Sequence, residues 1–377
     1  MTTINNDLNM LNSFFDIISK KNDIDIEYHL KNYATFAKET MQKKENFLYD
    51  SKQFWKTNFN KNTDIKSNEK IFTWVDIKEL TENKNNLPCD VSRSAFKNLI
   101  ETKTSLYVDN FSDFNFLDEI LPNFKEVTDY YRGAFALNQS RSHELYEAPR
   151  PILLLGDPGI GKTYYAKQLA KIFNTNFQFI DSNAISASWV LCGHNKGWRG
   201  ADAGLVFKLM AKSSSISPIL LIDEFDKLNA GKYYDPSSIF HQMLEKENAK
   251  NFYDDFVELS FDASQIIYIL TGNDKDTIPS TLLSRMTVFE IKNPNAEEMK
   301  KIIPTIYQNI LAQSKMFKPF LEDCEINKLV NYTPRQVYQT ISNNIYAQAS
   351  TILKQGKKRK QPLIISELLP ESRSIGF

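Results

Sequence analysis

Five short, largely apolar runs in the middle of the chain constrain its fold more than any other feature. They are "RPILLLG" ending at Gly156, "NFQFID" ending at Asp181, "SPILLID" ending at Asp223, "QIIYILTGN" ending at Asn273 and "TVFEI" ending at Ile291. Such runs are typical of strands that are buried on both faces of a sheet. Longer amphipathic stretches lie between them, so the pattern predicts an α/β fold in which helices flank a parallel sheet.

The chain of 377 residues is too long for one simple core, and its texture divides it into three parts. Residues 1–110 are predicted to form a mostly helical N-terminal region. Residues 111–292 hold the apolar runs and form the predicted α/β domain, and residues 293–377 are predicted to form a small helical lid. Within the lid, Thr333 can cap the clearest helix and Pro334 suits its first turn.

Charge balance and cysteine usage argue against several classes of protein. The chain carries 46 basic and 46 acidic residues and no formal net charge, which gives little support to nucleic-acid binding. Cys89, Cys192 and Cys324 lie far apart and form no CxxC pair, so neither a disulfide framework nor a zinc site is expected. The N-terminus has no signal-peptide pattern, and no apolar run approaches the ~20 residues of a membrane span. We therefore expect a soluble cytoplasmic protein with no membrane partner.

The first apolar run leads into a glycine-rich segment, "GDPGIGKT", that fits the pattern G-x-x-x-x-G-K-[ST]. Glycines let main-chain N–H groups crowd around phosphate oxygens where a Cβ would clash. The helix predicted for "TYYAKQLAKIF" adds partial positive charge at its N-terminus. The predicted phosphate-binding residues are Gly156, Asp157, Pro158, Gly159, Ile160, Gly161, Lys162 and Thr163.

The residues around this loop indicate a nucleoside triphosphate bound with Mg²⁺. Lys162 can reach the β- and γ-phosphates, and Thr163 can offer its hydroxyl to the metal ion. Asp223 and Glu224 stand at the carboxyl end of a predicted central strand, where open parallel sheets bind ligands. Asp223 is predicted to hold the Mg²⁺ shell, and Glu224 to take a proton from an attacking water.

Three further polar residues follow in the same order along the chain. Asn273 can orient the attacking water, although a lone Asn at this place is also typical of a turn. Arg285 precedes the last apolar run, and a guanidinium supplied in trans accelerates phosphoryl transfer about 10³–10⁵-fold. A solvated surface arginine is the alternative. Arg335 lies in the first turn of its helix and opposes the helix dipole, which indicates an anionic partner there. A neutral surface position is the alternative.

The order of these elements resembles that of the AAA+ ATPases. Residues 235–286 are similar to the ATPase module of Lon-type proteases, the stretches "IDEFDKL" and "TIPSTLLSRM" are especially alike, and the likeness covers roughly residues 148–345. It implies ATP hydrolysis with Mg²⁺ in a ring, usually of six subunits, with ATP between neighbours. By this resemblance Asn273 matches the first sensor and Arg335 the second, and Arg285 matches the finger that reaches the neighbour's ATP.

The sequence departs from the Lon-type pattern in three places. About 40 residues follow Arg335, too few for the Ser–Lys peptidase domain of those proteases, so proteolysis is not expected. The stretch "TPRQV" lacks the glycine that usually stands two positions before the arginine. Residues 1–110 do not resemble the family's N-terminal domain, so they indicate no substrate.

The segment "GHNKGWRGADAG", Gly193–Gly204, falls where related ATPases carry a loop that grips polypeptide in a central channel. Trp198 and Arg199 take the aromatic and following positions, and an aromatic side chain offers a large contact area at low entropy cost. The alternative is a core tryptophan in an ordinary turn. Tyr233 and Tyr234 form a second candidate channel loop.

Three functions are compatible with these patterns. The first is an ATP-driven, ring-forming protein remodeller or unfoldase that acts on an unidentified protein. The second is an ATP-gated assembly that recruits a partner through the N-terminal region, for example in a defence or regulatory complex; Glu224 and Arg285 argue against it, because a pure switch needs neither. The third is a motor on nucleic acid, supported only by "KQGKKRK" at residues 354–360, which is also typical of a solvated face.

Overall fold

The computed structural model describes residues 71–72, 74, 103–104, 112–140, 147–228, 236–311, 314, 316–354 and 360–366. These residues all belong to one compact unit, residues 69–377. Most of the helical region predicted for residues 1–110 lies outside the described residues, as do Tyr233 and Tyr234. None of the described helices combines the length and the apolar character that crossing a membrane requires.

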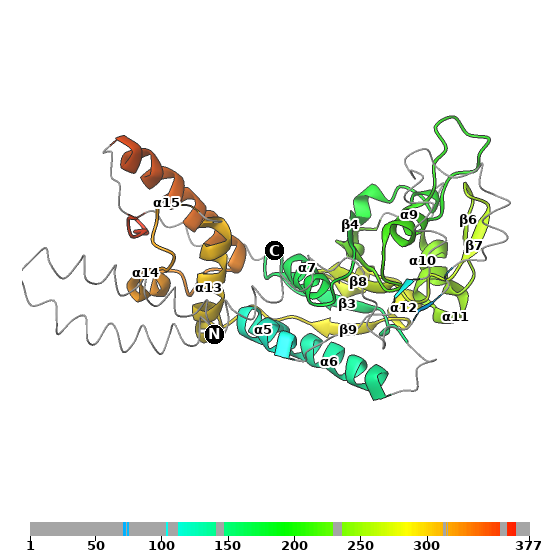
Figure 1. The fold of residues 1–377 in the computed structure, drawn as a ribbon, viewed down its shortest axis with the longest axis horizontal. Coiled ribbons are helices and arrows are strands. Elements are labelled where there is room, and N and C mark those ends of the chain that lie inside the picture. The colour runs from blue at the N-terminus through cyan, green and yellow to red at the C-terminus, as the bar shows by residue number, and fades with distance from the viewer. Residues whose placement is uncertain are drawn as a thin grey trace, which may run out of the picture. The chain divides into compact units, whose positions relative to one another are not determined.

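Five parallel strands form the central sheet of the described residues (Figure 1). In chain order they are β3 (Ile152–Leu155), β4 (Phe177–Asp181), β5 (Ile219–Asp223), β8 (Ile267–Gly272) and β9 (Thr287–Glu290). Their order across the sheet is β4-β5-β8-β3-β9. Each of the five apolar runs contains one of these strands, so the predicted parallel sheet is confirmed.

The central strands of the sheet are buried, and the pairing of the strands shows where each of them ends. Every residue of β3 and β8 is buried, and so are the first four residues of β5, whereas the edge strands β4 and β9 are only partly buried. Leu155 pairs with Gly272, and Asp181 pairs with Asp223. The strands therefore end at one edge of the sheet, and the loops that leave β3, β5 and β8 meet there.

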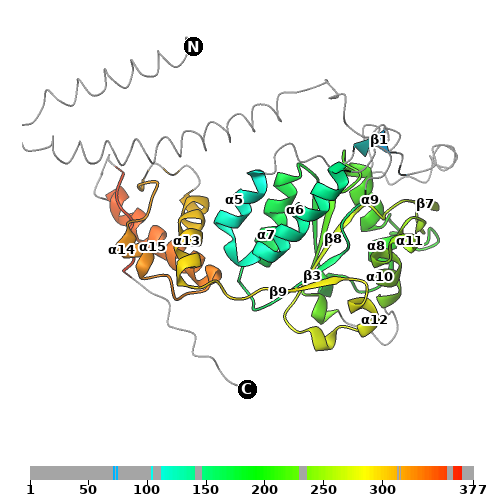
Figure 2. The same cartoon turned by 90° about the horizontal axis from the view of Figure 1, so that it is seen from below.

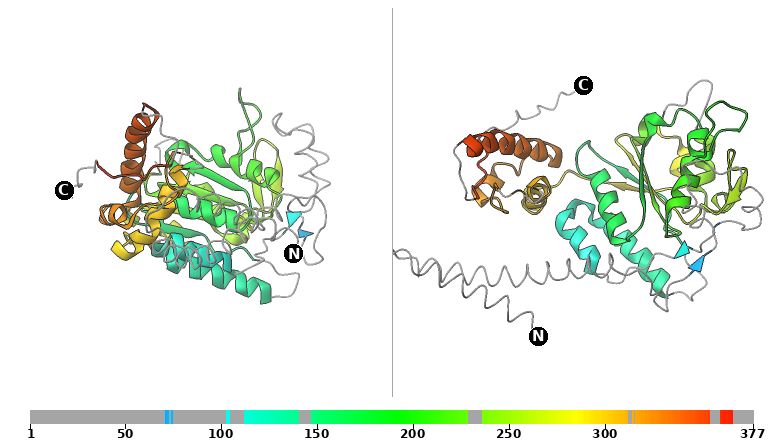
Figure 3. Two further views of the ribbon diagram at one scale, coloured as in Figure 1. Left: turned by 60° about the vertical axis from the view of Figure 1, so that its left-hand side comes forward. Right: turned by 45° about the horizontal axis from the view of Figure 1, so that its top comes forward.

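Helices cover both faces of the sheet (Figures 2 and 3). On one side lie α5 (Ser112–Ile120), η2 (Pro122–Phe124), α6 (Lys125–Ser140) and α7 (Lys162–Ile172). On the other side lie α8 (Trp189–Cys192), α9 (Leu205–Lys212), α10 (Ser237–Leu244), α11 (Lys246–Ala249) and α12 (Ser280–Leu283). The short segments η3 (Ser182–Ala184), η4 (Phe225–Lys227) and η5 (Lys275–Thr277) follow β4, β5 and β8. Both faces of the three central strands β3, β5 and β8 are thus removed from water, as their apolar runs require.

Two small antiparallel pairs accompany the sheet among the described residues. Strand β6 (Phe252–Asp254) pairs with β7 (Leu259–Phe261), and β1 (Ile71–Phe72) pairs with β2 (Lys103–Thr104). The Trp74 ring lies 5.4 Å from the ring of Phe261 and 5.9 Å from that of Phe207, measured between centroids. Trp74 belongs by position to the predicted N-terminal region, yet it is buried in the core of the α/β part.

The C-terminal part is helical, as predicted, and consists of α13 (Ala296–Leu311), α14 (Asp323–Asn327) and α15 (Pro334–Lys354). It has a hydrophobic core of its own, which includes Met299, Ile303, Tyr307, Val337 and Ile341. Thr333 caps α15: its Oγ1 accepts a hydrogen bond from Gln336 N at 3.4 Å, and Gln336 Oε1 accepts one from Thr333 N at 2.9 Å. This reciprocal pair is a capping box, and it confirms the predicted start of the helix.

Candidate functional site

The glycine-rich loop joins β3 to α7 at the carboxyl edge of the sheet. Gly156 has a φ of 153°, and a Cβ at this position would lie 2.4 Å from the carbonyl oxygen of Ile291. Gly159 has a φ of 84°, and a Cβ there would lie 2.7 Å from the Cβ of Arg335. Only glycine therefore fits at these two positions, and the loop can curve back over the N-terminus of α7.

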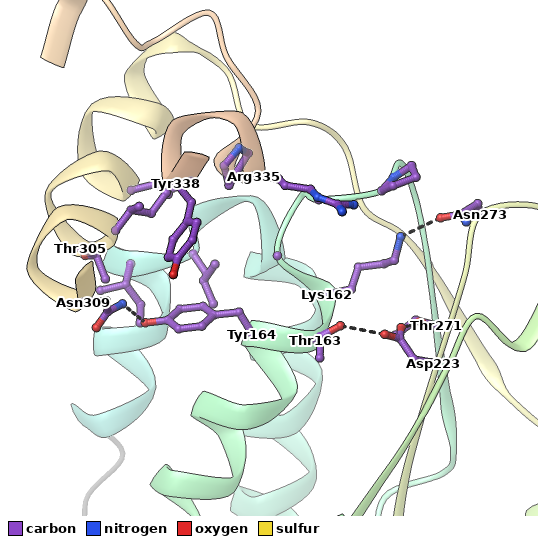
Figure 4. A pocket seen from close by; sticks show the side chains of 18 of the residues that line it. Lys162, Thr163, Tyr164, Asp223, Thr271, Asn273, Thr305, Asn309, Arg335 and Tyr338 are labelled. Atoms are coloured by element: carbon purple, nitrogen blue, oxygen red, sulfur yellow. Dashed lines mark hydrogen bonds between the residues drawn. The ribbon is translucent and has the colours of Figure 1, made fainter. Parts of the chain in front are cut away.

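Lys162 is the first residue of α7 and lies inside this curve (Figure 4). Its Nζ donates hydrogen bonds to the carbonyl oxygen of Gly156, to that of Asp157 at 3.1 Å and to Asn273 Oδ1 at 3.1 Å. Burial lowers the pKa of Lys162, while the carboxylate of Asp223 acts in the opposite direction. The result is a partly desolvated cation, which interacts more strongly with an anion than an exposed lysine does.

Asp223, at the end of β5, is held by hydroxyl groups from two other elements. Thr163 Oγ1 donates to Asp223 Oδ2 at 3.2 Å, and Thr271 Oγ1 donates to Oδ1 (Figure 4). Carboxylate and hydroxyl oxygens are the ligands that Mg²⁺ prefers, so Asp223 and Thr163 fit the ion predicted from the sequence. Thr271 was not predicted to belong to the site, although a hydroxyl residue inside the apolar run "IYILTG" was a signal for it.

Glu224 follows Asp223 and turns the chain sharply out of the sheet. Its φ of 54° is left-handed, which costs a residue with a Cβ about 1–3 kcal/mol and often marks a functional position. Its Oε2 accepts hydrogen bonds from Lys227 Nζ at 2.8 Å and from Asn183 Nδ2 at 3.4 Å. Its main-chain N–H donates to Thr271 Oγ1 at 3.1 Å. The Glu224 carboxylate is therefore held in place by Asn183 of η3 and Lys227 of η4.

A pocket of about 500 Å³ lies between the phosphate loop and the helical C-terminal part, and this size is usual for small-molecule sites. Its lining includes the predicted residues Pro158, Gly159, Gly161, Lys162, Thr163, Asp223, Glu224, Asn273 and Arg335. The other end is more apolar, with Ile120, Leu121, Ile302, Ile306 and Tyr338. Gly156 and Asp157 contribute carbonyl groups to Lys162 rather than to the lining, and Ile160 is buried in the core. The pocket thus combines a cationic end with an apolar end, which complement the anionic phosphates and the apolar base of a nucleotide.

The family described as "ATPase family associated with various cellular activities (AAA)" matches residues 152–293. The match begins at the first residue of β3 and ends after β9, so it spans the whole sheet, the phosphate loop and the acidic strand end. Residues 152–293 are an AAA ATPase domain.

The AAA domain is similar in sequence to Lon proteases. The Lon protease of Fervidobacterium nodosum is 28% identical over 261 residues, which are 66% of this chain and 32% of that protein. Lon protease 1 of Borreliella burgdorferi is 37% identical over 140 residues, which are 37% of this chain and 17% of that protein. The chain therefore spans about a third or less of the length of these relatives, and the resemblance noted in the sequence is confirmed for the ATPase part.

The fold is similar to that of two solved structures of Hsp104. Hsp104 of S. cerevisiae in an extended complex with casein superposes with a TM-score of 0.55 and 19% sequence identity, over 75% of this chain and 53% of that one. A closed-state reconstruction of Hsp104 with ATPγS and casein gives the same TM-score over 78% of this chain and 55% of that one. At this identity the likeness concerns the fold alone.

Arg335 joins the helical C-terminal part to the phosphate loop of the AAA domain. Its main-chain N–H donates to the carbonyl oxygen of Gly159 at 3.2 Å, and its aliphatic side chain lies against the Cα of Gly159. Figure 4 shows the guanidinium extending over the loop on the side of Lys162. The structure thus places this predicted residue in the pocket, although helix α15 lies about 170 residues after the loop.

A second contact joins the AAA domain to the helical C-terminal part at the apolar end of the pocket. Asn309 Nδ2 on α13 donates to Tyr164 Oη on α7 at 2.9 Å (Figure 4). Both residues line the pocket, and burial raises the pKa of Tyr164. The sequence analysis did not identify this pair, because neither residue belongs to a motif and only folding brings their helices together.

Arg285 lies outside this pocket. Its Nε forms an ion pair with Glu245 Oε2 at 3.0 Å, and its Nη1 donates to the carbonyl oxygen of Thr281 at 2.5 Å. The guanidinium of Arg150 in turn donates to the carbonyl oxygens of Ser284 and, at 3.3 Å, of Arg285. Arg285 is therefore held on the surface of the AAA domain, away from the nucleotide pocket of its own chain.

Trp198 lies in the loop between α8 and α9 and is 57% exposed. Its ring is 5.9 Å from the half-buried ring of Trp189, and the next residue, Arg199, is also exposed. Neither residue lines the nucleotide pocket. The exposure of Trp198 contradicts the alternative of a core tryptophan in an ordinary turn.

Proposed function

We propose that this chain binds ATP with Mg²⁺, hydrolyses it, and uses the energy to remodel or unfold protein as a ring-forming assembly. The observation that carries the proposal is the convergence of Lys162, Thr163, Asp223, Glu224 and Asn273 on one pocket at the end of a parallel sheet. These residues lie at or after the ends of three different strands, β3, β5 and β8. Stability of the fold does not require polar residues from three strands to converge, so their convergence supports a binding site.

In this proposal the main-chain N–H groups of the loop and the Lys162 ammonium hold the phosphates. Thr163 and Asp223 would hold Mg²⁺, which neutralises charge on the phosphate oxygens when it is bound. Glu224 takes a proton from the attacking water, and Asn273 orients that water, because its amide is fixed by Lys162. Arg335 reports the state of the γ-phosphate to the lid, since it belongs to α15 and lies on the loop.

The position of Arg285 supports a ring in which neighbouring copies complete each other's sites. It is held outside its own pocket by Glu245 and by the carbonyl oxygen of Thr281. A guanidinium supplied by a neighbour stabilises charge on the transferring phosphoryl group. We propose six copies to a ring, by analogy with the AAA+ family.

The exposed indole of Trp198, with Arg199 beside it, is the proposed grip on polypeptide. A large aromatic ring contacts apolar side chains of any sequence, so such a grip needs no specific motif in the substrate. Hsp104, whose fold is similar, has been visualised with casein, which makes protein a reasonable substrate class for this chain.

The proposed division into domains follows the two hydrophobic cores of the described residues. Residues 111–292 would form the AAA large domain and residues 293–377 the lid, because one core ends at Ile291 and the other begins at Met299. Residues 1–110 would form the N-terminal region that selects a partner. The segment around Trp74 is an exception, since Trp74 packs into the core of the large domain.

One observation favours the alternative, an ATP-gated assembly that recruits a partner. The Glu224 carboxylate forms an ion pair with Lys227 at 2.8 Å, so one of its oxygens is engaged by a side chain of its own chain rather than by an attacking water. In a switch of this kind ATP binding alone would drive assembly, and hydrolysis would be slow.

The deciding experiment compares wild type, Glu224→Gln and Trp198→Ala in an unfolding assay. The assay follows loss of fluorescence from a green fluorescent protein that carries an unstructured tail, with ATP and Mg²⁺ present. We expect unfolding by the wild type only, while both variants still bind ATP. Unfolding by Trp198→Ala at the wild-type rate would contradict the contact between Trp198 and polypeptide. Unfolding by Glu224→Gln at the wild-type rate would show that ATP binding without hydrolysis is sufficient, which favours the switch.

A further inference from the structure

The loop that carries Trp198 has a narrow neck that closes on a buried carboxylate. Gly193 and Gly204 form the two ends of this loop, and a Cβ on Gly204 would lie 2.5 Å from the main-chain nitrogen of Gly193. Asp254 of β6 lies between them and is fully buried. Its Oδ2 accepts a hydrogen bond from Gly204 N at 2.8 Å, and a Cβ on Gly193 would lie 2.6 Å from its Oδ1. The neck is therefore built around Asp254 and has no room for larger residues.

The second oxygen of the same carboxylate holds the turn of the β6–β7 hairpin. Asp254 Oδ1 accepts hydrogen bonds from Phe256 N at 3.0 Å and from Val257 N at 2.9 Å. One buried side chain thus joins the hairpin turn to the neck of the Trp198 loop. Hydrogen bonds from main-chain N–H groups to a carboxylate are among the strong ones, because the acceptor is charged.

Further contacts support the loop along its length. Asp255 N donates to the carbonyl oxygen of Cys192 at 2.8 Å, just before the neck. Between Gly193 and Trp198, Lys196 Nζ forms an ion pair with Glu258 Oε2 at 2.6 Å. The hairpin turn, residues 254–258, therefore supports the loop at both ends and at Lys196; we call this turn the brace of the loop.

Burial of the Asp254 carboxylate costs desolvation free energy. Burial raises the pKa of its carboxyl to about 6, although the N–H groups of Val257 and Gly204 lower it. Asp254 lies outside the nucleotide pocket, so its burial has no role in holding ATP. A neutral residue would avoid the desolvation cost, but it would not accept three main-chain hydrogen bonds at once.

We infer that Asp254 is a positioning residue that holds the Trp198 loop in a fixed, protruding arrangement suited to an extended polypeptide. The inference rests on the proposed function, because it takes Trp198 to be the residue that contacts polypeptide. Asp254 acts through the neck of the loop and does not itself touch the substrate. The substrate class is an unfolded segment with accessible apolar side chains, since those are the groups that an exposed indole binds.

The first test measures the loop itself and does not depend on any activity. Hydrogen–deuterium exchange of the peptide spanning residues 193–204 is compared among wild type, Asp254→Asn and Asp323→Asn. The amide in Asp254→Asn keeps the shape of the side chain but loses the charge and one acceptor, and Asp323 is an exposed control on α14. We expect exchange to accelerate about tenfold or more in Asp254→Asn alone. Unchanged exchange in that peptide would overturn the inference.

Lys196→Ala is the second variant, because Lys196 lies on the surface and its removal does not threaten the core. We expect a smaller acceleration of exchange, confined to residues 193–204, while peptides of the phosphate loop stay at the wild-type rate. Acceleration spread over the whole AAA domain would contradict a local brace.

The second test separates this inference from the proposed function. The affinity for reduced, carboxymethylated, fluorescein-labelled α-lactalbumin is measured by anisotropy with ATP, for Trp198→Ala and Asp254→Asn. We expect each variant to lose about tenfold or more in affinity for this polypeptide, with ADP affinity unchanged. Wild-type affinity in Trp198→Ala would contradict the proposed function. Loss in Trp198→Ala with wild-type affinity in Asp254→Asn would overturn the role of Asp254 alone.

Discussion

The side-chain oxygen of Asn273 accepts a hydrogen bond from the Lys162 ammonium at 3.1 Å, although 111 residues separate the two in the chain. The bond forms because β3 and β8 are neighbours in the sheet, so the loops that leave them meet at one edge. The hydrogen bond places the amide of Asn273, which follows β8, next to the ammonium group of Lys162, at the start of α7. The residues around this bond are accordingly the most informative ones to change.

Lys162→Met should lower the affinity for ATP about 10- to 100-fold, because hydrogen bonds between a partly buried ammonium and phosphate oxygens are lost. Isothermal titration calorimetry with ATP and Mg²⁺ measures the effect. Lys167→Met is the matched control, since Lys167 is exposed on the same helix. Equal affinity in the two variants would rule out phosphate binding by Lys162.

Glu224→Gln should leave the affinity for ATP near that of the wild type and slow hydrolysis about 10²–10⁴-fold. The amide keeps the size of the side chain but cannot take a proton from water. Phosphate release under saturating ATP is the measurement, and Glu297→Gln, an exposed change on α13, is the control. If Glu224→Gln hydrolyses ATP at the wild-type rate, another group is the base.

Mixing Glu224→Gln with Arg285→Ala should restore part of the hydrolysis that each variant lacks. A protomer with an intact Glu224 would then receive Arg285 from its neighbour, because Arg285 lies outside its own pocket. The rate is measured against the molar ratio of the two proteins. A chain that carries both changes supplies neither group and serves as the control. Mixtures no more active than the separate variants would argue against shared sites.

The stability of the wild type should fall relative to that of Asp254→Asn as the pH rises from about 4 to about 6. Burial raises the pKa of Asp254 to about 6, so the folded protein holds this proton more tightly than the unfolded chain does. The protonated form therefore favours folding, and that contribution is lost as the pH passes the folded pKa. The difference in free energy of unfolding should change by roughly 3 kcal/mol.

Urea titrations of both proteins at pH 4, 5, 6 and 7 measure this difference. Cys192 and Asp255 interact electrostatically with Asp254 and are present in both proteins, so their effects largely cancel in the comparison. Parallel stability curves over this range would show that Asp254 is ionised as easily in the folded protein as in water.

Local patterns were sufficient to predict the strands, the phosphate loop and the start of α15. The apolar runs predicted β3, β5 and β8 because residues buried on both faces leave few polar positions. The loop was predicted because phosphate binding needs glycines, a lysine and a hydroxyl within eight consecutive residues. The capping box at Thr333 is equally local, since its two partners are three residues apart.

Folding alone decided which distant residues meet. Thr271 joins Asp223, Asn309 joins Tyr164, and Asp254 joins the two ends of the Trp198 loop. Each contact links elements that are 48 to 145 residues apart, and no spacing in the chain encodes it. The physical reason is that a motif reports the chemistry of neighbouring residues, whereas the packing of helices and strands sets the distance between separate ones. The same packing exposes Trp198 and keeps Arg285 out of its own pocket, two features on which the proposed function depends.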